Sequence, residues 1–246
     1  MKIYRYFLDG MPWYLAKHYW WAYLWPSAVW FFDHQPVINA ILFFQYHKLM
    51  QTTLNCFQTT PNGRVLQLTC VYGCLTPKLN EILGKQALHL TDVAEVQLHL
   101  ARSKSQTLTL RPTRMNAEQL GYKNNVFHTV VLFFLLHEMP HEARVRTLSE
   151  CMRVLAPGGS LLITEYAPQP VRHWLYRLPF CRWILTSLEP FLDSLWHEDI
   201  EALLNESANP FDKRVEVISQ HHIFFSFYSV TEYRVIDGSI ERFDDL

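Results

Sequence analysis

Strand-like and helix-like stretches alternate between residues 65 and 165, and this alternation constrains the fold more than any other feature of the chain. Short apolar runs typical of buried strands occur at 65–69, 87–91, 107–111, 128–135 and 160–165. Apolar residues at helical spacing predict helices at about 75–84, 94–103 and 141–154. Because helices separate the strands, the pattern predicts right-handed βαβ units and a mostly parallel, doubly wound α/β sheet with helices on both faces.

Both ends of the chain depart from this alternation. Five of the eight tryptophans lie in the first 60 residues, and apolar residues at helical spacing follow them, which predicts an N-terminal helical layer. Stretches 214–218 and 221–236 are predicted to pair as a C-terminal antiparallel hairpin. We therefore expect an aromatic-rich helical segment at 1–60 and a Rossmann-like domain at 61–246, with a substrate-covering insert near 167–212. Ligands in such sheets bind at the carboxyl ends of the strands.

The composition narrows the classes of protein to consider. The formal charge is −1 and no basic block stands out, so we expect no nucleic-acid partner. Five cysteines without CxxC or zinc-finger spacing indicate buried thiols in a reducing compartment, and we expect a cytoplasmic protein. The apolar stretch Val126–Met139 is too short to span a bilayer, so no transmembrane helix is expected.

Four stretches, in order along the chain, resemble the RquA family of rhodoquinone biosynthesis enzymes. They are His18–Tyr23, the loop Cys70-Val71-Tyr72-Gly73-x-Leu75-Thr76, the block Leu132–Glu138, and Leu188-Glu189-Pro190-Phe191. The stretches Phe127–Glu138 and Arg153–Leu162 also resemble the related ubiquinone/menaquinone C-methyltransferases. The resemblance runs from about residue 14 to 235 and implies a class I S-adenosylmethionine (SAM) methyltransferase-like fold.

The resemblance also implies an unusual reaction. The family uses SAM as an amino donor, replaces a methoxy group of ubiquinone with an amino group, and needs Mn²⁺. A methoxy-bearing quinone is an electron-poor vinylogous ester, so addition of an amine and elimination of methanol suffice. The substrate is a polyprenyl quinone, which must be taken from a membrane, and we expect peripheral association with the inner membrane.

The first loop departs from the ordinary methyltransferase pattern. The acidic residue that accepts a hydrogen bond from the SAM α-ammonium is here Gln67, and glycine positions are Thr69 and Val71. A neutral amide does not hold the amine protonated, and a neutral amine is a nucleophile. Bulky Val71 and Tyr72 are expected to turn the methionine end of SAM toward the quinone. The alternative is a degenerate site that no longer binds SAM.

Other cofactor contacts follow from the strand ends. Asp92 follows a predicted strand where an acidic residue bonds ribose hydroxyls, although it also suits a helix N-cap. Asn116 stands where the family has an acid facing the adenine amine, although a plain surface loop is an alternative. The expected SAM-binding residues are Gln67, Thr69, Cys70, Val71, Tyr72, Gly73, Thr76, Asp92, Val93, Asn116 and Ala117.

His137 and Glu138 end the fourth strand of the alternating region and are the candidate catalytic residues, together with Tyr72. Both can reach one site only if the chain has already turned out of the strand, and a helix-capping pair is the alternative. Imidazole and carboxylate suit Mn²⁺, and the candidate metal ligands are His137, Glu138, Glu165 and His18. In that role the metal would polarise the quinone carbonyl.

The segment from Val171 to Leu188 is basic and aromatic and contains no acid. Such a stretch suits docking on an anionic membrane surface, and a helical cover over the sheet is the alternative. The N-terminal aromatic block is expected either to roof the substrate or to pack in the core. Two other functions stay open: a conventional SAM-dependent methyltransferase acting on a quinone or lipid, and a non-catalytic SAM-fold quinone-binding subunit.

Overall fold

A computed structural model describes residues 10–70, 72–105, 107–168 and 173–238. Within these ranges seven strands form one sheet in the order β3-β2-β1-β4-β5-β7-β6. Strands β1 to β5 pair in parallel, and β7 pairs antiparallel with both β5 and β6. Their bounds are β1 Val65–Leu68, β2 Leu88–Asp92, β3 Leu110–Arg114, β4 Phe127–Phe133, β5 Leu155–Tyr166, β6 Lys213–Ile223 and β7 Tyr228–Asp237. This confirms the predicted α/β fold of the class I SAM methyltransferase kind, including the C-terminal hairpin.

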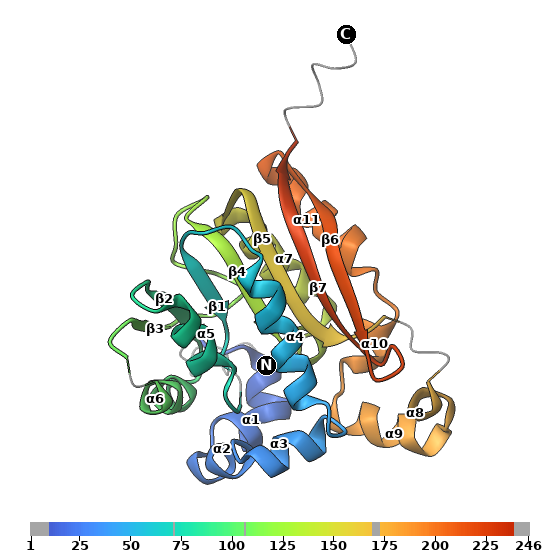
Figure 1. Cartoon of the computed structure of the whole chain (residues 1–246). Coiled ribbons are helices and arrows are strands. Elements are labelled where there is room, and N and C mark those ends of the chain that lie inside the picture. Colours follow the sequence, from blue (N-terminus) through green and yellow to red (C-terminus); the bar gives the residue numbers. More distant parts are fainter. Residues whose placement is uncertain (1–9, 71, 106, 169–172, 239–246) are drawn as a thin grey trace.

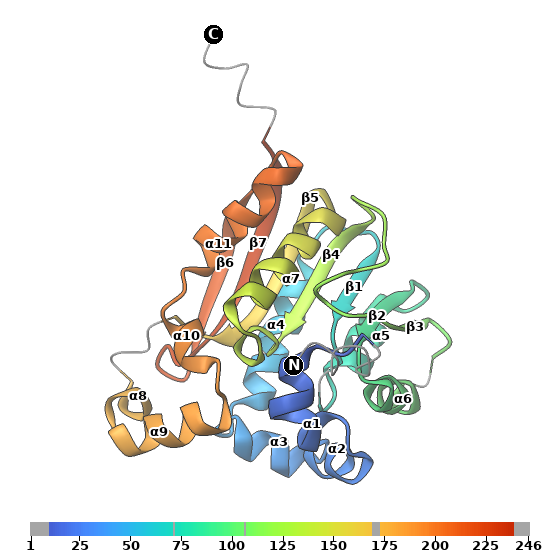
Figure 2. The same cartoon turned by 180° about the vertical axis from the view of Figure 1, so that it is seen from behind.

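Helices cover both faces of the sheet. Helix α4 (Tyr46–Gln58) lies on one face, while α7 (His141–Val154) and α11 (Ile200–Ala208) pack together on the other (Figures 1 and 2). Helix α5 (Leu75–Leu83) follows β1 and contacts α4, and α6 (Glu95–Lys104) follows β2 and packs against it. The central strands β1 and β4 are almost entirely buried, as expected for parallel strands covered on both faces.

Two element boundaries differ from the sequence prediction. Strand β3 begins at Leu110 rather than at residue 107 and contains Pro112, which an edge strand tolerates because one side of it needs no hydrogen bonds. The stretch Ala156–Gly159, whose Pro-Gly-Gly sequence is typical of a turn, lies inside β5. There the register with β4 shifts between Phe127 and Thr129, so the Pro-Gly-Gly stretch forms a bulge rather than a turn.

The N-terminal segment is helical but broken into short pieces. They are a π-helix at Leu15–Tyr19, then α1 (Trp20–Tyr23), α2 (Pro26–Phe32) and α3 (Gln35–Ile41). The expected helical run through Leu49 is interrupted after α3, where Phe43 and Phe44 adopt positive φ angles of 50° and 62°. The core joins this segment to the sheet, since Tyr46 and Leu49 belong to the same buried apolar cluster as the strands.

The insert between β5 and β6 is helical as well. It contains α8 (Trp174–Arg177), α9 (Pro179–Leu188), α10 (Leu192–Trp196) and α11, with a short 3-10 turn at Asn209–Phe211. Helices α8 and α9 lie at the same end of the molecule as α1, α2 and α3 in both views (Figures 1 and 2). This is the end at which a cavity meets the carboxyl ends of β1 to β4.

Candidate active site

A cavity of about 370 Å³ lies where strands β1 to β4 end and the N-terminal helices cover them. Its wall on the sheet side includes Thr69 after β1, Asp92 at the end of β2, Asn116 after β3 and Leu135 after β4. The helical segments add Tyr19 and Tyr23, together with other aromatic and aliphatic side chains. The lining is therefore mostly apolar with a few polar groups at one end, as expected for a site that binds an organic ligand.

The loop after β1 contains positive φ angles, which glycine usually adopts, although a glycine is present at only one of these positions. Thr69 has φ +69°, an unusual conformation for a β-branched residue, and lines the cavity with Cys70 and Tyr72. Gly73 has φ +84° and donates its N–H to Asp33 at 2.8 Å. Val71 lies outside the described residues. The Tyr72 ring stacks on Tyr23 with centroids 5.5 Å apart, so this candidate catalytic residue forms an aromatic wall of the cavity.

Gln67 lies behind this loop rather than in the cavity wall. Its side chain is fully buried, and Nε2 donates to the Thr69 carbonyl at 3.2 Å. No described residue forms a hydrogen bond with its Oε1. Thr76, in the first turn of α5, is also buried with an unpartnered hydroxyl, and neither it nor Gly73 lines the cavity.

Asp92 and Val93 line the cavity at the end of β2. The Asp92 carboxylate accepts the backbone N–H groups of Cys70 and Ala94, each at 2.7 Å, and so ties the β1 loop to the start of α6. Burial raises the pKa of Asp92 to about 6, although these hydrogen bonds oppose the shift. Each oxygen retains a lone pair, so the capping and ribose-binding roles are compatible here.

Asn116 and Ala117 line the cavity beyond β3. The Asn116 side-chain carbonyl accepts the Glu118 N–H at 2.9 Å, which stabilises the local turn. That oxygen can accept a second hydrogen bond. The position is therefore half-buried turn structure with one acceptor site left for a ligand.

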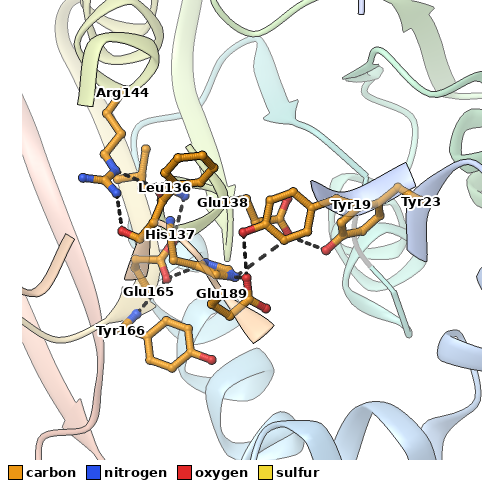
Figure 3. Close-up of polar contacts among 10 residues, drawn as sticks. Tyr19, Tyr23, Leu136, His137, Glu138, Arg144, Glu165, Tyr166 and Glu189 are labelled. Atoms are coloured by element: carbon orange, nitrogen blue, oxygen red, sulfur yellow. Dashed lines mark hydrogen bonds and ion pairs between the residues drawn. The ribbon is translucent and has the colours of Figure 1, made fainter. Parts of the chain in front are cut away.

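His137 and Glu138 sit in a 3-10 turn, Leu136–Glu138, that follows β4, so both can face one site. Glu165, near the end of β5, orients the imidazole: its Oε1 is 2.9 Å from His137 Nδ1. Its Oε2 accepts the N–H groups of Leu136 and His137, and Oε1 also accepts the Tyr166 N–H. Both Glu165 oxygens are thus occupied within the protein, which leaves His137 Nε2 as the ring nitrogen facing the other carboxylates (Figure 3).

Two carboxylates converge on His137 Nε2, and a tyrosine hydroxyl holds each of them (Figure 3). Glu138 Oε1 and Glu189 Oε2 each lie 3.9 Å from Nε2. Tyr23 donates its hydroxyl to Glu138. Tyr19 donates its hydroxyl to Glu189 at 2.9 Å. Glu138, Glu189, His137 and both tyrosines line the cavity, so this group forms an ionisable part of its wall.

Burial and mutual charge shift the protonation of this cluster. Burial alone disfavours the charged imidazole, but the Glu165, Glu189 and Glu138 carboxylates outweigh it and raise the pKa of His137 to about 10. Burial, opposed by His137, raises the pKa of Glu138 to about 8 and also raises that of Glu189. At neutral pH the cluster therefore holds a charged imidazolium beside carboxyl groups that are ready to exchange protons.

Of the four candidate metal ligands, the structure brings three together. His137, Glu138 and Glu165 lie within one cluster, whereas the His18 ring packs against Trp13 and Phe191 and does not line the cavity. His18 therefore stands apart from the carboxylates because its helix presents it to an aromatic neighbourhood.

Sequence reasoning missed Glu189, Tyr19 and Tyr23 as members of the site. The acidic residue that ends an otherwise acid-free stretch was a usable signal for Glu189, which also lies in the fourth stretch of the family resemblance. The tyrosines gave no such signal, because the N-terminal segment contains many aromatics and only the tertiary fold selects two of them.

Part of the chain matches a known family of domains. Residues 65–159 match the family described as a methyltransferase domain. The ubiquinone/menaquinone biosynthesis C-methyltransferase UbiE of Wigglesworthia glossinidia brevipalpis is 28% identical over 148 residues, which is 58% of this chain and 58% of that protein. The chain thus spans just over half the length of the curated relatives it matches first.

Solved structures share the fold at low identity. The N-methyltransferase NodS of Bradyrhizobium japonicum has a TM-score of 0.56 at 14% identity, over 78% of this chain and 96% of that chain. The [4+2]-cyclase SpnF has a TM-score of 0.50 at 16% identity, over 75% of this chain and 80% of that chain. At such identities the likeness establishes the fold alone.

Proposed function

We propose that this chain, which has the fold of class I SAM methyltransferases and matches a methyltransferase domain over residues 65–159, is an enzyme that transfers an amino group from SAM to ubiquinone. In this reaction an amino group replaces a methoxy group of the ring, which gives rhodoquinone. The observation that carries the proposal is the buried, neutral Gln67 with a free Oε1 at the position of the usual acid.

The sheet-side wall of the cavity supports a SAM site. In this fold ligands bind at the carboxyl ends of the strands, and Asp92 and Asn116 each keep acceptor capacity there. Two buried polar atoms without partners, Gln67 Oε1 and the Thr76 hydroxyl, flank the altered loop. Neither atom lines the cavity, so for a bound ligand to reach the Gln67 amide the loop after β1 must shift.

Gln67 distinguishes amino transfer from ordinary methyl transfer. When bound, SAM would supply a nucleophilic amine, which must be neutral because an ammonium has no free electron pair. A carboxylate beside the amine would favour the ammonium, whereas the neutral Gln67 amide can accept a hydrogen bond without that bias. The replacement lowers the cost of presenting a neutral amine to the ring.

The polar end of the cavity supplies the proton transfers that substitution requires. A C–N bond forms between the SAM α-nitrogen and the ring carbon that carries the methoxy group, and the C–O bond breaks so that methanol leaves. The nitrogen is then still bonded to the α-carbon of the methionine portion. Release of the aminoquinone requires a second step, an elimination that breaks this N–Cα bond, leaves a proton on the nitrogen and forms a C=C bond in the methionine portion. His137 carries a proton at neutral pH, since its pKa is raised to about 10, and can donate it to the oxygen on which negative charge develops. Glu138 is mostly protonated at neutral pH, since its pKa is raised to about 8, so Glu189 is the group that we assign to accept the proton that the amine loses.

The quinone is the substrate class that the apolar part of the cavity supports. Most of the lining is aromatic or aliphatic, and the matched relatives are named for ubiquinone and menaquinone biosynthesis. A flat quinone ring stacks well on aromatic side chains such as the paired Tyr23 and Tyr72.

Manganese, which the family resemblance implies, does not fit the side chains as they are placed. Imidazole and carboxylate are suitable donors, but Glu165 spends both oxygens on His137 and the backbone. In the described part of the chain, no group of three or more His, Cys, Asp or Glu residues is arranged to hold a metal ion. No step of the proposed reaction therefore passes through a metal.

Methyl transfer to a quinone or lipid is the second candidate, because the matched relatives are C-methyltransferases. Against it stands the fact that the fold alone does not dictate methyl transfer, since SpnF is a cyclase. Product analysis distinguishes the two candidates. The chain is incubated with a short-chain ubiquinone and SAM, with and without Mn²⁺, and the mass of the quinone is measured by mass spectrometry. Amino transfer gives a lighter quinone, because an amino group weighs less than the methoxy group it replaces. A heavier, methylated product supports the second candidate, and no turnover under any condition supports a non-catalytic subunit.

A further inference from the structure

One end of the molecule exposes large apolar side chains of a kind that is usually buried in a folded protein. On α9 the exposed residues Phe180, Trp183 and Ile184 follow helical spacing and form a stripe, with Phe180 69% and Trp183 64% exposed. On α2, Trp25, Trp30 and Phe31 are exposed, with Trp30 at 66%. We call these six residues the apolar face. Within the described residues, α9 has no buried side chain at all, so packing inside this chain does not account for its apolar stripe.

The two helices lie at the same end of the fold although they are far apart in the sequence. Helices α1, α2 and α3 lie at the same end of the molecule as α8 and α9 in both views, with α3 between α2 and α9 (Figures 1 and 2). Both halves of the apolar face therefore belong to one end of the molecule. Exposed large apolar side chains gathered at one end of a protein mark an interaction site.

The cavity opens onto this end. Trp21, Ile41 and Leu188 line the cavity and are also exposed on the surface, with Leu188 60% exposed. Trp21 and Ile41 come from the N-terminal helices, whereas Leu188 ends α9, so the mouth lies between the two halves of the apolar face. A long apolar chain can run from the cavity to the apolar face without crossing a polar surface.

The charges around the apolar face suit an anionic partner. Between residues 174 and 188 the chain carries Arg177 and Arg182 and no acid, and Arg182 is paired with Asp193 at 2.6 Å, so Arg177 is the basic residue of this stretch on which the charge argument rests. Between residues 12 and 58 the sole acid is Asp33, which Lys104 neutralises at 2.6 Å. Tryptophan, phenylalanine and arginine on one surface are typical of segments that lie in the headgroup region of a bilayer.

We propose that the apolar face docks on an anionic phospholipid bilayer, with α2 and α9 inserted on either side of the cavity mouth, so that the quinone enters directly from the lipid. This deepens the proposed function and rests on it for the nature of the substrate, whereas docking itself requires no chemistry. The described helices include none long and apolar enough to cross a membrane. The sequence placed docking on the 171–188 segment alone, whose residues 171 and 172 lie outside the described ranges, and the structure adds α2 as its second half.

The test measures co-sedimentation of the full chain with vesicles of phosphatidylcholine, with and without phosphatidylglycerol, in the absence of SAM and quinone. The variants are Phe180→Ser with Trp183→Ser on α9, and Trp25→Ser with Trp30→Ser on α2. Leu108→Ser is the matched control, because Leu108 is 93% exposed on the turn before β3. We expect each double variant to lower the partition coefficient about tenfold or more, since each removes two inserted aromatic side chains. The control should bind as the unmodified chain does, and Arg177→Gln should reduce the preference for anionic vesicles.

Three results would overturn the docking proposal. The unmodified chain does not bind vesicles, or the α9 variant loses binding while the α2 variant keeps it. The third is a concentration-dependent dimer in light scattering that both double variants abolish. The last result would mean that a second copy of the chain covers the apolar face. Activity on a short-chain, water-soluble quinone without lipid is measured in parallel. Docking variants should keep this activity, because none of the four substituted residues lines the cavity. Vesicle binding without any turnover would support docking and contradict the proposed function.

Discussion

Thr69 and Gly73 show how a single loop can hold its shape after losing most of its glycines. Thr69 accepts a left-handed backbone despite its branched side chain, and its carbonyl is held by the Gln67 amide. Gly73 cannot be replaced in the same way. A Cβ at Gly73 would overlap the Tyr46 hydroxyl, which accepts the Cys74 N–H at 2.6 Å.

Gly73→Ala is therefore expected to destabilise the chain by more than the cost of its backbone conformation alone. Gly84→Ala is the matched control, because Gly84 also has positive φ but open space around a Cβ. We expect a loss of about 1–2 kcal/mol for the control and at least about 3 kcal/mol for Gly73→Ala, as measured by urea unfolding. Equal losses would show that Tyr46 moves aside freely.

Gln67→Glu tests the chemical role of the neutral amide. A carboxylate at this position would hold the SAM amine protonated, so we expect slower amino transfer at saturating SAM and a rate that recovers as the pH rises. Calorimetric titration with SAM shows whether the variant still binds SAM, so that a slower rate can be distinguished from a loss of binding. The proposed role of Gln67 fails if the variant binds SAM and works at the unmodified rate from neutral to alkaline pH.

Glu138 gives a prediction about stability and pH. Burial raises the pKa of Glu138 from its ordinary value of 4.5 to about 8, so the folded state resists ionisation that the unfolded chain undergoes near 4.5. The resulting penalty is absent below the unfolded pKa, grows as the pH rises, and is complete above about 8. Glu138→Gln removes it, so the melting temperature of the variant should rise relative to the unmodified chain between about pH 4 and pH 8.

The control for this comparison is Glu206→Gln, which removes an exposed carboxylate from α11. Its melting temperature should follow the unmodified chain across the same pH range. A difference for Glu138→Gln that does not change with pH would mean that this carboxyl titrates normally in the folded protein.

At the level of elements, periodicity predicted what local sequence determines. The helix at 141–154 and the strands β1, β2 and β4 follow from the spacing of their apolar residues. The helix buries one face and the strands bury both, so each pattern of burial can be read from the local sequence. The predicted strand boundaries were wrong where contacts with neighbouring strands determine them. Pro112 is tolerated in β3 only because that strand lies at the sheet edge, and Pro157 is accommodated by a bulge in β5.

The N-terminal helices illustrate the same limit. Apolar residues at helical spacing continue past Ile41, yet the chain breaks at Phe43 and Phe44. The Phe43 ring stacks on Phe224 in the β6–β7 hairpin at 5.8 Å, so the break coincides with a contact more than 180 residues away along the chain. A contact of this range leaves no trace in local periodicity.

At the level of the whole molecule, the sequence predicted the part of the candidate site at the strand ends and missed the part that the helical segments supply. His137, Glu138 and Glu165 come together because parallel strands end at one edge, which the strand pattern implied. Glu189, Tyr19 and Tyr23 reach the same cluster from the insert and the N-terminal segment, and no spacing rule relates those segments to β4. The sequence therefore located the strand-end half of the cavity, while tertiary packing determined its cover.

The direct test of amino transfer follows the nitrogen itself. The chain is given short-chain ubiquinone and SAM labelled with ¹⁵N at the α-amine and ¹³C at the sulfonium methyl, and the quinone product is analysed by mass spectrometry. The account predicts ¹⁵N attached to the ring, a methoxy group lost, and no ¹³C in the product. A product that carries ¹³C and no ¹⁵N would contradict it and would identify the chain as a methyltransferase.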